Sequence, residues 1–142
     1  MAQKFKPYFE VDLSDYVEAP DRADLEIIGE DIIDHIIERT VSGTGIKNGR
    51  RFSFPSYTKE YEAIEGKSGA PDLVLSGDML DDLEVLKVIL SRNVVRIGYD
   101  AAYVGLGKVE GNSLGTYGKK SPIRGKARPF LGITKTELKG IA

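Results

Sequence analysis

The stretch that decides the predicted fold is residues 84–100, EVLKVILSRNVVRIGYD. Two strand-like runs, Glu84 to Ser91 and Val94 to Asp100, flank Arg92-Asn93, and asparagine favours the positive φ that a two-residue hairpin turn needs. Side chains alternate along a strand, so this register gives the hairpin one fully apolar face. A slip by one residue would place charged side chains on that face. The expected pairs on the apolar face are Leu90 with Val95, Val88 with Ile97, and Leu86 with Tyr99.

A second apolar surface belongs to a helix predicted from Asp21 to Val41. Asp21 is the expected N-cap, and Ser42-Gly43 supplies the stop signal. At about 100° per residue, the apolar side chains cover an arc of about 180°, and acidic side chains occupy the opposite arc. The apolar set is Leu25, Ile28, Ile32, Ile33, Ile36 and Ile37, and the acidic set is Glu26, Glu30, Asp31, Asp34 and Glu38.

Residues 1–20 form an N-terminal arm with strand-like alternation from Phe5 to Leu13. Pro7 argues against a central strand, because proline lacks the backbone donor that a sheet interior needs. Two interpretations stay open: a frayed arm, or an arm that docks on a neighbouring subunit and buries its apolar residues there.

Short elements follow the helix and close the chain. Residues 40–49 are expected to form a glycine-rich loop with a tight turn at Asn48-Gly49, and an extended run begins near Phe52. Residues 129–133 are expected to form a strand. Thr134 and Glu137 then form a capping box that opens a short terminal helix.

Together these elements predict an α+β fold. The long N-terminal helix packs on a small, mostly antiparallel sheet with the hairpin at its centre, and a short helix ends the chain. Residues 21–142 form one domain, interrupted by a long Gly/Lys-rich loop at about 101–127. Loops of that length are usually functional or disordered.

Composition argues against enzyme chemistry. The 142 residues include no cysteine and one histidine, and no apolar run reaches the roughly 18 residues of a membrane span. Asp31, His35 and Glu38 have a spacing that could hold a metal, but a solvated acidic face explains them better. Gly105-Leu106-Gly107-Lys108 departs from the phosphate-loop pattern, because Val109 stands where Ser or Thr is required. We therefore expect no catalytic residues, no metal and no cofactor.

Charge is strongly polarised along the chain although its net value is -2. Residues 1–46 contain 4 basic and 11 acidic residues, whereas residues 107–142 contain 8 basic and 2 acidic residues. Such asymmetry indicates that the basic end meets an acidic partner, either nucleic acid or another copy of the chain. The basic candidates are Lys119, Lys120, Arg124, Lys126 and Arg128, and the acidic candidates are Glu30, Asp34 and Glu38.

Three segments resemble the virion-morphogenesis proteins of tailed bacteriophages, a family of tail-completion or neck proteins. The clearest is Arg128-Pro-Phe-Leu-Gly-Ile-Thr-Lys-Thr-Glu-Leu138, which resembles the R-P-F-L-G segment and capped helix that close the family's domain. Gly49 to Phe52 and Leu75 to Met79 are similar to upstream family motifs and occur in the same order. The resemblance covers residues 21–142, and the long Gly/Lys loop and the N-terminal arm depart from it.

This resemblance implies a non-catalytic structural protein at the head–tail junction. It would form a homo-oligomeric ring by head-to-tail contacts and meet neck, portal-side and tail proteins. The genome would pass through the lumen without sequence-specific contact, and no membrane would be involved. The expected location is the virion, and the host cytoplasm during assembly. The alternative is a small nucleic-acid-binding domain that uses the basic segment 119–128.

Overall fold

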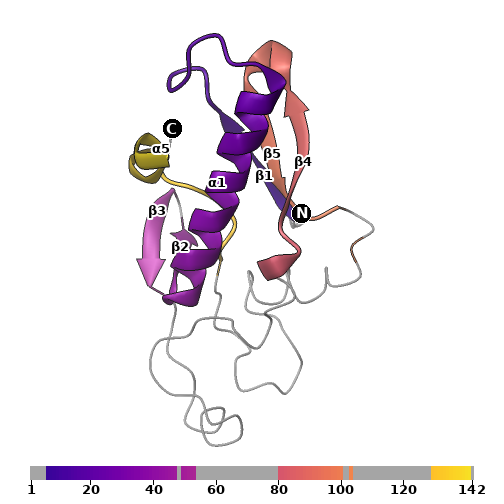
Figure 1. The fold of residues 1–142 in the computed structure, drawn as a ribbon. Coiled ribbons are helices and arrows are strands. Elements are labelled where there is room, and N and C mark those ends of the chain that lie inside the picture. Colours follow the sequence, from indigo (N-terminus) through magenta and orange to yellow (C-terminus); the bar gives the residue numbers. More distant parts are fainter. Residues whose placement is uncertain (1–5, 48, 54–79, 101–102, 104–128, 142) are drawn as a thin grey trace, which may run out of the picture.

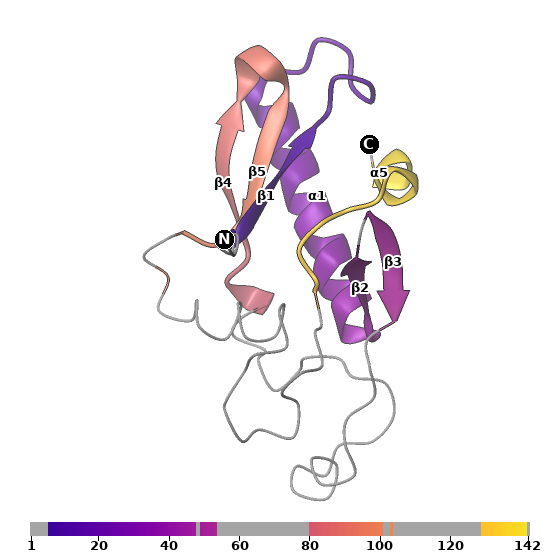
Figure 2. The same ribbon diagram turned by 180° about the vertical axis from the view of Figure 1, so that it is seen from behind.

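The computed structural model describes residues 6–47, 49–53, 80–100, 103 and 129–141. Helix α1 runs through the middle of the molecule, with a three-stranded sheet on one flank and a two-stranded hairpin with α5 on the other (Figures 1 and 2). Helix and antiparallel sheets together confirm the expected α+β class. The elements are β1 (Tyr8–Asp12), α1 (Arg22–Val41), β2 (Thr44–Lys47), β3 (Arg50–Ser53), β4 (Glu84–Ile89), β5 (Val94–Gly98) and α5 (Lys135–Ile141).

Helix α1 forms where the sequence predicts it. The Asp21 side chain caps the first turn by accepting a hydrogen bond from the Asp24 backbone N–H at 2.8 Å. The Asp24 side chain in turn accepts one from the Asp21 backbone N–H at 3.0 Å. This reciprocal capping box satisfies two donors that have no partner inside the helix. The buried face includes Leu25, Ile32 and Ile36, each fully removed from solvent.

Residues 8–12 form an edge strand of the chain's own sheet. The strand order is β1-β5-β4, and β1 pairs antiparallel with β5 from Tyr8↔Gly98 to Asp12↔Val94. Gly98 permits this pairing, because its φ is +150° and a Cβ there would lie 2.3 Å from the Pro7 carbonyl oxygen. The alternation seen in the sequence is therefore a strand, and its apolar residues Val11 and Leu13 are buried within the same chain.

The hairpin formed by β4 and β5 exists, but the predicted register is wrong by two residues next to the turn. It is wrong by three residues beyond the irregularity between Val85 and Lys87, where Val85 instead of Val88 lies opposite Ile97. Val88 pairs with Val95 rather than with Ile97, because Leu90 to Arg92 form a 3-10 turn instead of continuing the strand. Asn93 adopts the left-handed conformation expected of it, with φ 54°. A shift of two keeps the same side chains on each face of β5, so Val95 and Ile97 remain buried. Leu90, expected on the apolar face, is 43% exposed.

Two other local predictions need correction. The expected loop at 40–49 contains β2, which pairs with β3 around the predicted Asn48-Gly49 turn, with Lys47 opposite Arg50. The expected strand at 129–133 is absent from the described residues there, which are joined to β2 by one bond from the Ile46 N–H to the Pro129 carbonyl at 3.0 Å. The Thr134–Glu137 capping box and the helix it opens are confirmed.

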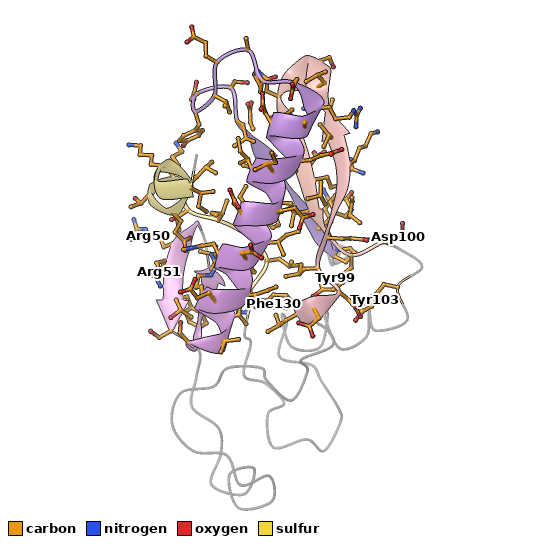
Figure 3. All side chains as sticks on the ribbon, in the orientation of Figure 1. Arg50, Arg51, Tyr99, Asp100, Tyr103 and Phe130 are labelled. Carbon is orange, nitrogen blue, oxygen red and sulfur yellow. The ribbon has the colours of Figure 1, made fainter. Side chains whose placement is uncertain are left out.

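The core lies between α1 and the inner face of the three-stranded sheet, and aromatic side chains close its lower end. Tyr99 stacks on Tyr103 with ring centroids 4.9 Å apart and meets the edge of Phe130 at 6.4 Å. Figure 3 shows these three side chains gathered below the sheet, where the C-terminal segment crosses α1. Phe130 thereby joins the end of the chain to the same core as the hairpin.

Candidate subunit-interface surfaces

The outward side of α1 is a row of carboxylates. Glu30, Asp34 and Glu38 follow one another at four-residue spacing, so they lie on one side of the helix, and all three are exposed. Within the described part of the chain, no salt bridge involves any of them. Like charges at this spacing repel one another modestly, and a cationic partner would relieve that repulsion.

An apolar hollow adjoins this acidic row. Its volume is about 460 Å³, and it lies between the first turns of α1 and strand β4. Ile27, which is 61% exposed, and Val85 supply apolar wall, whereas Glu26, Glu30 and Asp31 bring carboxylates to the rim. The hollow thus brings one exposed aliphatic side chain and three carboxylates together on the same stretch of surface.

The basic half of the expected interface lies outside the described residues. This applies to Lys119, Lys120, Arg124, Lys126 and Arg128. The expected contact between these cations and the helix acids therefore stays a prediction, and only the acidic half has a place in the structure.

A buried ionic cluster connects α1 to the C-terminal segment, and sequence reasoning missed it. The Arg39 side chain is 1% exposed and donates to both carboxylate oxygens of Glu137 at 3.1 and 3.2 Å. Its second terminal nitrogen donates to the carbonyls of Phe130 at 2.6 Å and Gly132 at 3.0 Å. One guanidinium thus joins both the irregular segment from Pro129 to Gly132 and the first turn of α5 to helix α1.

His35 belongs to the same cluster. Its Nε2 donates to Glu137 Oε2 at 2.5 Å, so His35 points toward α5 rather than into a metal site with Asp31 and Glu38. Across the described ranges, no group of three or more His, Cys, Asp or Glu side chains is placed to hold a metal ion. Arg51 on β3 lies with its Nε 4.0 Å from the same oxygen, Glu137 Oε2.

These partners control the ionisation of Glu137. Burial alone raises the pKa of this carboxyl, but the Thr134 backbone N–H, His35 and Arg39 outweigh it and lower the pKa to about 2. Burial lowers the pKa of Arg39, and the adjacent Glu137 opposes that shift. Glu137 is therefore a permanent anion near neutral pH, which suits a structural tie rather than proton transfer.

One sequence signal could have pointed to the cluster. The T-x-x-E pattern at Thr134–Glu137 places Glu137 at the start of a helix, and Arg39 falls at the C-terminal end of α1 on its apolar side. A cation on an apolar arc requires a buried anion, but nothing in the local sequence indicates which carboxylate supplies it.

Comparisons with protein-family models, with curated proteins and with solved structures found no match to this chain. Among the helices that the structure describes, none has the length and apolar composition needed to cross a membrane.

Proposed function

We propose that the chain is a structural protein of the tailed-phage head–tail junction that assembles into a ring by head-to-tail contacts. The observation that carries this proposal is the exposed acidic row Glu30, Asp34 and Glu38, which has no ion-pair partner among the described residues and lies beside an apolar hollow. In the same chain, the segment 119–128 contains five basic residues and no acidic one. Two unlike surfaces on one subunit are what a cyclic, heterologous interface requires.

Further support comes from the resemblance at residues 128–138. Arg39 donates to the carbonyls of Phe130 and Gly132, so this segment has a definite structural role in closing the domain. The proposal places the protein in the virion, and in the host cytoplasm during assembly. Its partners are further copies of itself and neighbouring neck, portal-side and tail proteins, with genome DNA passing through the lumen.

Charge complementarity across such an interface sets orientation and assembly rate more than affinity. Each exposed pair contributes about 0–1 kcal/mol and weakens as salt rises. Several pairs repeated around a ring still select the correct neighbour, because like-charge contacts in wrong arrangements are unfavourable.

The test is a charge-reversal and rescue experiment. Lys119→Glu, Lys120→Glu and Arg124→Glu together should impair ring formation, measured by mass in solution and by electron microscopy of the purified protein. Adding Glu30→Lys, Asp34→Lys and Glu38→Lys should partly restore the ring, because the interface charges are then exchanged rather than lost. A matched control reverses the exposed Lys87, Arg92 and Lys139, which changes net charge equally and should leave assembly intact.

The nucleic-acid alternative predicts a different result. A DNA-binding role for residues 119–128 would make the triple Glu variant lose DNA affinity with a shallower salt dependence. The helix reversals would then strengthen DNA binding without any partner subunit. Tight, salt-sensitive DNA binding by the wild-type protein in a gel-shift titration, with no rescue of assembly, would replace the ring proposal with this alternative.

A further inference from the structure

Among the described residues, strand β1 has a partner on one side only, because it stands at the end of the order β1-β5-β4. The Tyr99 N–H donates to the Pro7 carbonyl at 2.9 Å, and the Leu13 N–H donates to the Asn93 carbonyl at 2.8 Å. In an antiparallel pair, alternate residues of a strand direct their backbone N–H and C=O groups to the same neighbouring strand. The backbone groups of Phe9 and Val11 therefore also point toward β5. The backbone N–H and C=O groups of Tyr8, Glu10 and Asp12 therefore point away from the sheet.

No described residue pairs with this outer edge of β1. A hollow of about 290 Å³ runs beside it instead, between β1 and the segment that leads into α5. Apolar side chains on both sides of the hollow are Phe9, Val11, Tyr16, Ile133 and Leu138, and the remaining lining is polar: Glu10, Asp12, Asp15, Thr134 and Lys135. Edge groups without a partner among the described residues, beside a hollow with apolar and acidic lining, form an arrangement that can accept an added strand with basic residues.

The two faces of β1 specify what kind of strand fits. Glu10 and Asp12 lie on the outer face of the sheet and are exposed, whereas Phe9 and Val11 turn toward α1 and the core. Side chains on an added strand continue these two faces. A matching strand has basic residues on alternate positions, and small or aliphatic residues between them.

The chain itself contains such a pattern at residues 123–128, Ile-Arg-Gly-Lys-Ala-Arg. Arg124, Lys126 and Arg128 occupy one set of alternate positions. Ile123, Gly125 and Ala127 occupy the other, and two of these three are small enough for a narrow hollow. The alternation holds whether the segment runs parallel or antiparallel to β1, since either direction keeps the basic side chains beside Glu10 and Asp12.

We propose that residues 123–128 of a second copy add to the outer edge of β1 as a further strand. Backbone hydrogen bonds to Tyr8, Glu10 and Asp12 would supply affinity, and the acidic outer face would supply specificity for the basic alternate positions. The proposal rests on the proposed function in needing a second copy. It goes further by naming a backbone-mediated contact of residues 123–128 with β1, in addition to the contact of Lys119 and Lys120 with the acidic row of α1.

Glu10→Pro is the decisive substitution. Proline at this position removes an outward N–H while leaving every bond between β1 and β5 in place, and edge strands tolerate it. Glu10→Ala is the matched control, because both variants lose the ion pair between Glu10 and Arg96 but only proline loses the donor. Assembly should weaken by about tenfold or more in Glu10→Pro relative to Glu10→Ala, as expected for a lost hydrogen bond that leaves a buried acceptor unpaired.

A second variant tests the alternation independently of net charge. Exchanging two neighbours, as Lys126→Ala with Ala127→Lys, keeps the composition but puts a lysine on the face of the added strand that continues Phe9 and Val11. The labelled peptide of residues 121–130 should bind the full-length chain, and the peptide with this exchange should bind at least about tenfold more weakly. Equal binding of the two peptides would show that charge alone is recognised and would overturn the strand proposal.

Hydrogen exchange gives the residue-level result. Amides of Phe9 and Val11 should be protected in every state, whereas those of Tyr8, Glu10 and Asp12 should become protected only on assembly. Protection of the outward amides that does not depend on concentration would mean that the segment docks within its own chain, which contradicts the proposal. Rings that form normally in Glu10→Pro would overturn this inference and leave the ring itself standing, whereas an absence of any oligomer would count against the proposed function.

Discussion

Arg39 is the residue that holds the C-terminal segment, residues 129–141, against α1. Its guanidinium is buried, and its four hydrogen bonds reach one carboxylate and two carbonyls. Burying a cation is costly unless an anion is paired with it, so Arg39 and Glu137 each offset the desolvation cost of the other. Its Nε and the Thr40 hydroxyl lack a partner among the described residues, which makes the cluster less than fully satisfied.

Removing the anion from this cluster should be costly. Glu137→Gln keeps the shape of the side chain and an oxygen that can accept from the Thr134 backbone N–H. It leaves the positive charge of Arg39 without an anion, so we expect a loss of about 3 kcal/mol in the free energy of unfolding. Urea denaturation at neutral pH measures it. Lys139→Ala, an exposed change on the same short helix, serves as control and should cost less than about 0.5 kcal/mol. The double variant Arg39→Met with Glu137→Leu should lose less unfolding free energy than the sum of the losses in Arg39→Met and Glu137→Leu. Each single variant leaves one buried charge without its partner, whereas the double variant removes both charges.

The same carboxylate predicts a pH dependence. The pKa of Glu137 is lowered from 4.5 to about 2 in the folded protein, so its contribution to stability is fully present above pH 4.5 and is lost as pH falls toward 2. The difference in unfolding free energy between wild type and Glu137→Gln should therefore shrink across that window. A difference that stays constant from pH 5 to pH 2 would show that the carboxylate is not held ionised by its neighbours.

At the scale of elements, Gly29 sets how closely α1 approaches the sheet. A Cβ added there would lie 2.8 Å from Val85 Cγ2 and 3.0 Å from Val95 Cγ1, so the helix touches β4 and β5 through its own backbone. This close approach also shapes the hollow beside Ile27, because Val85 lines both features.

Gly29→Ala should consequently destabilise the protein although alanine favours helices. Overpacking of a tight contact costs about 1–3 kcal/mol, which exceeds the gain of about 1 kcal/mol in helix propensity. Gly140→Ala on α5 is the matched control, since nothing lies within 4 Å of its added Cβ, and it should be neutral or slightly stabilising. Thermal unfolding of both variants measures the contrast, and equal melting temperatures would show that α1 shifts freely to make room.

The elements also show where sequence reasoning succeeds and fails. The capping boxes at Asp21 and Thr134 were predictable because both partners lie within four residues. The hairpin register was not, because a 3-10 turn at Leu90–Arg92 takes up two extra residues that strand propensity alone assigns to β4. The strand at Tyr8–Asp12 was visible as alternation, but its partner is about 85 residues away and no local signal identifies it.

At the scale of the whole molecule, the same distinction separates the candidate surfaces. The acidic row on α1 follows from helical spacing, so Glu30, Asp34 and Glu38 could be named from the sequence and are found exposed together. The cluster of Arg39, His35 and Glu137 joins residues about a hundred positions apart, and the outer edge of β1 exists only once the strand order is known. Surfaces made by one element are predictable, whereas sites made by several elements require the fold.

The opposite border of the three-stranded sheet behaves differently from β1. Between Val85 and Lys87 the pairing of β4 with β5 slips, which bends the strand and breaks the even spacing of its backbone groups. Exposed Glu84 and Lys87 add charge along the same strand. An irregular, charged border is a poor template for another chain, whereas a regular one invites fibre growth. Direct pairing of β4 with the sheet of another copy is therefore disfavoured, which leaves β1 as the better border for a partner strand and limits edge-to-edge growth of the amyloid kind.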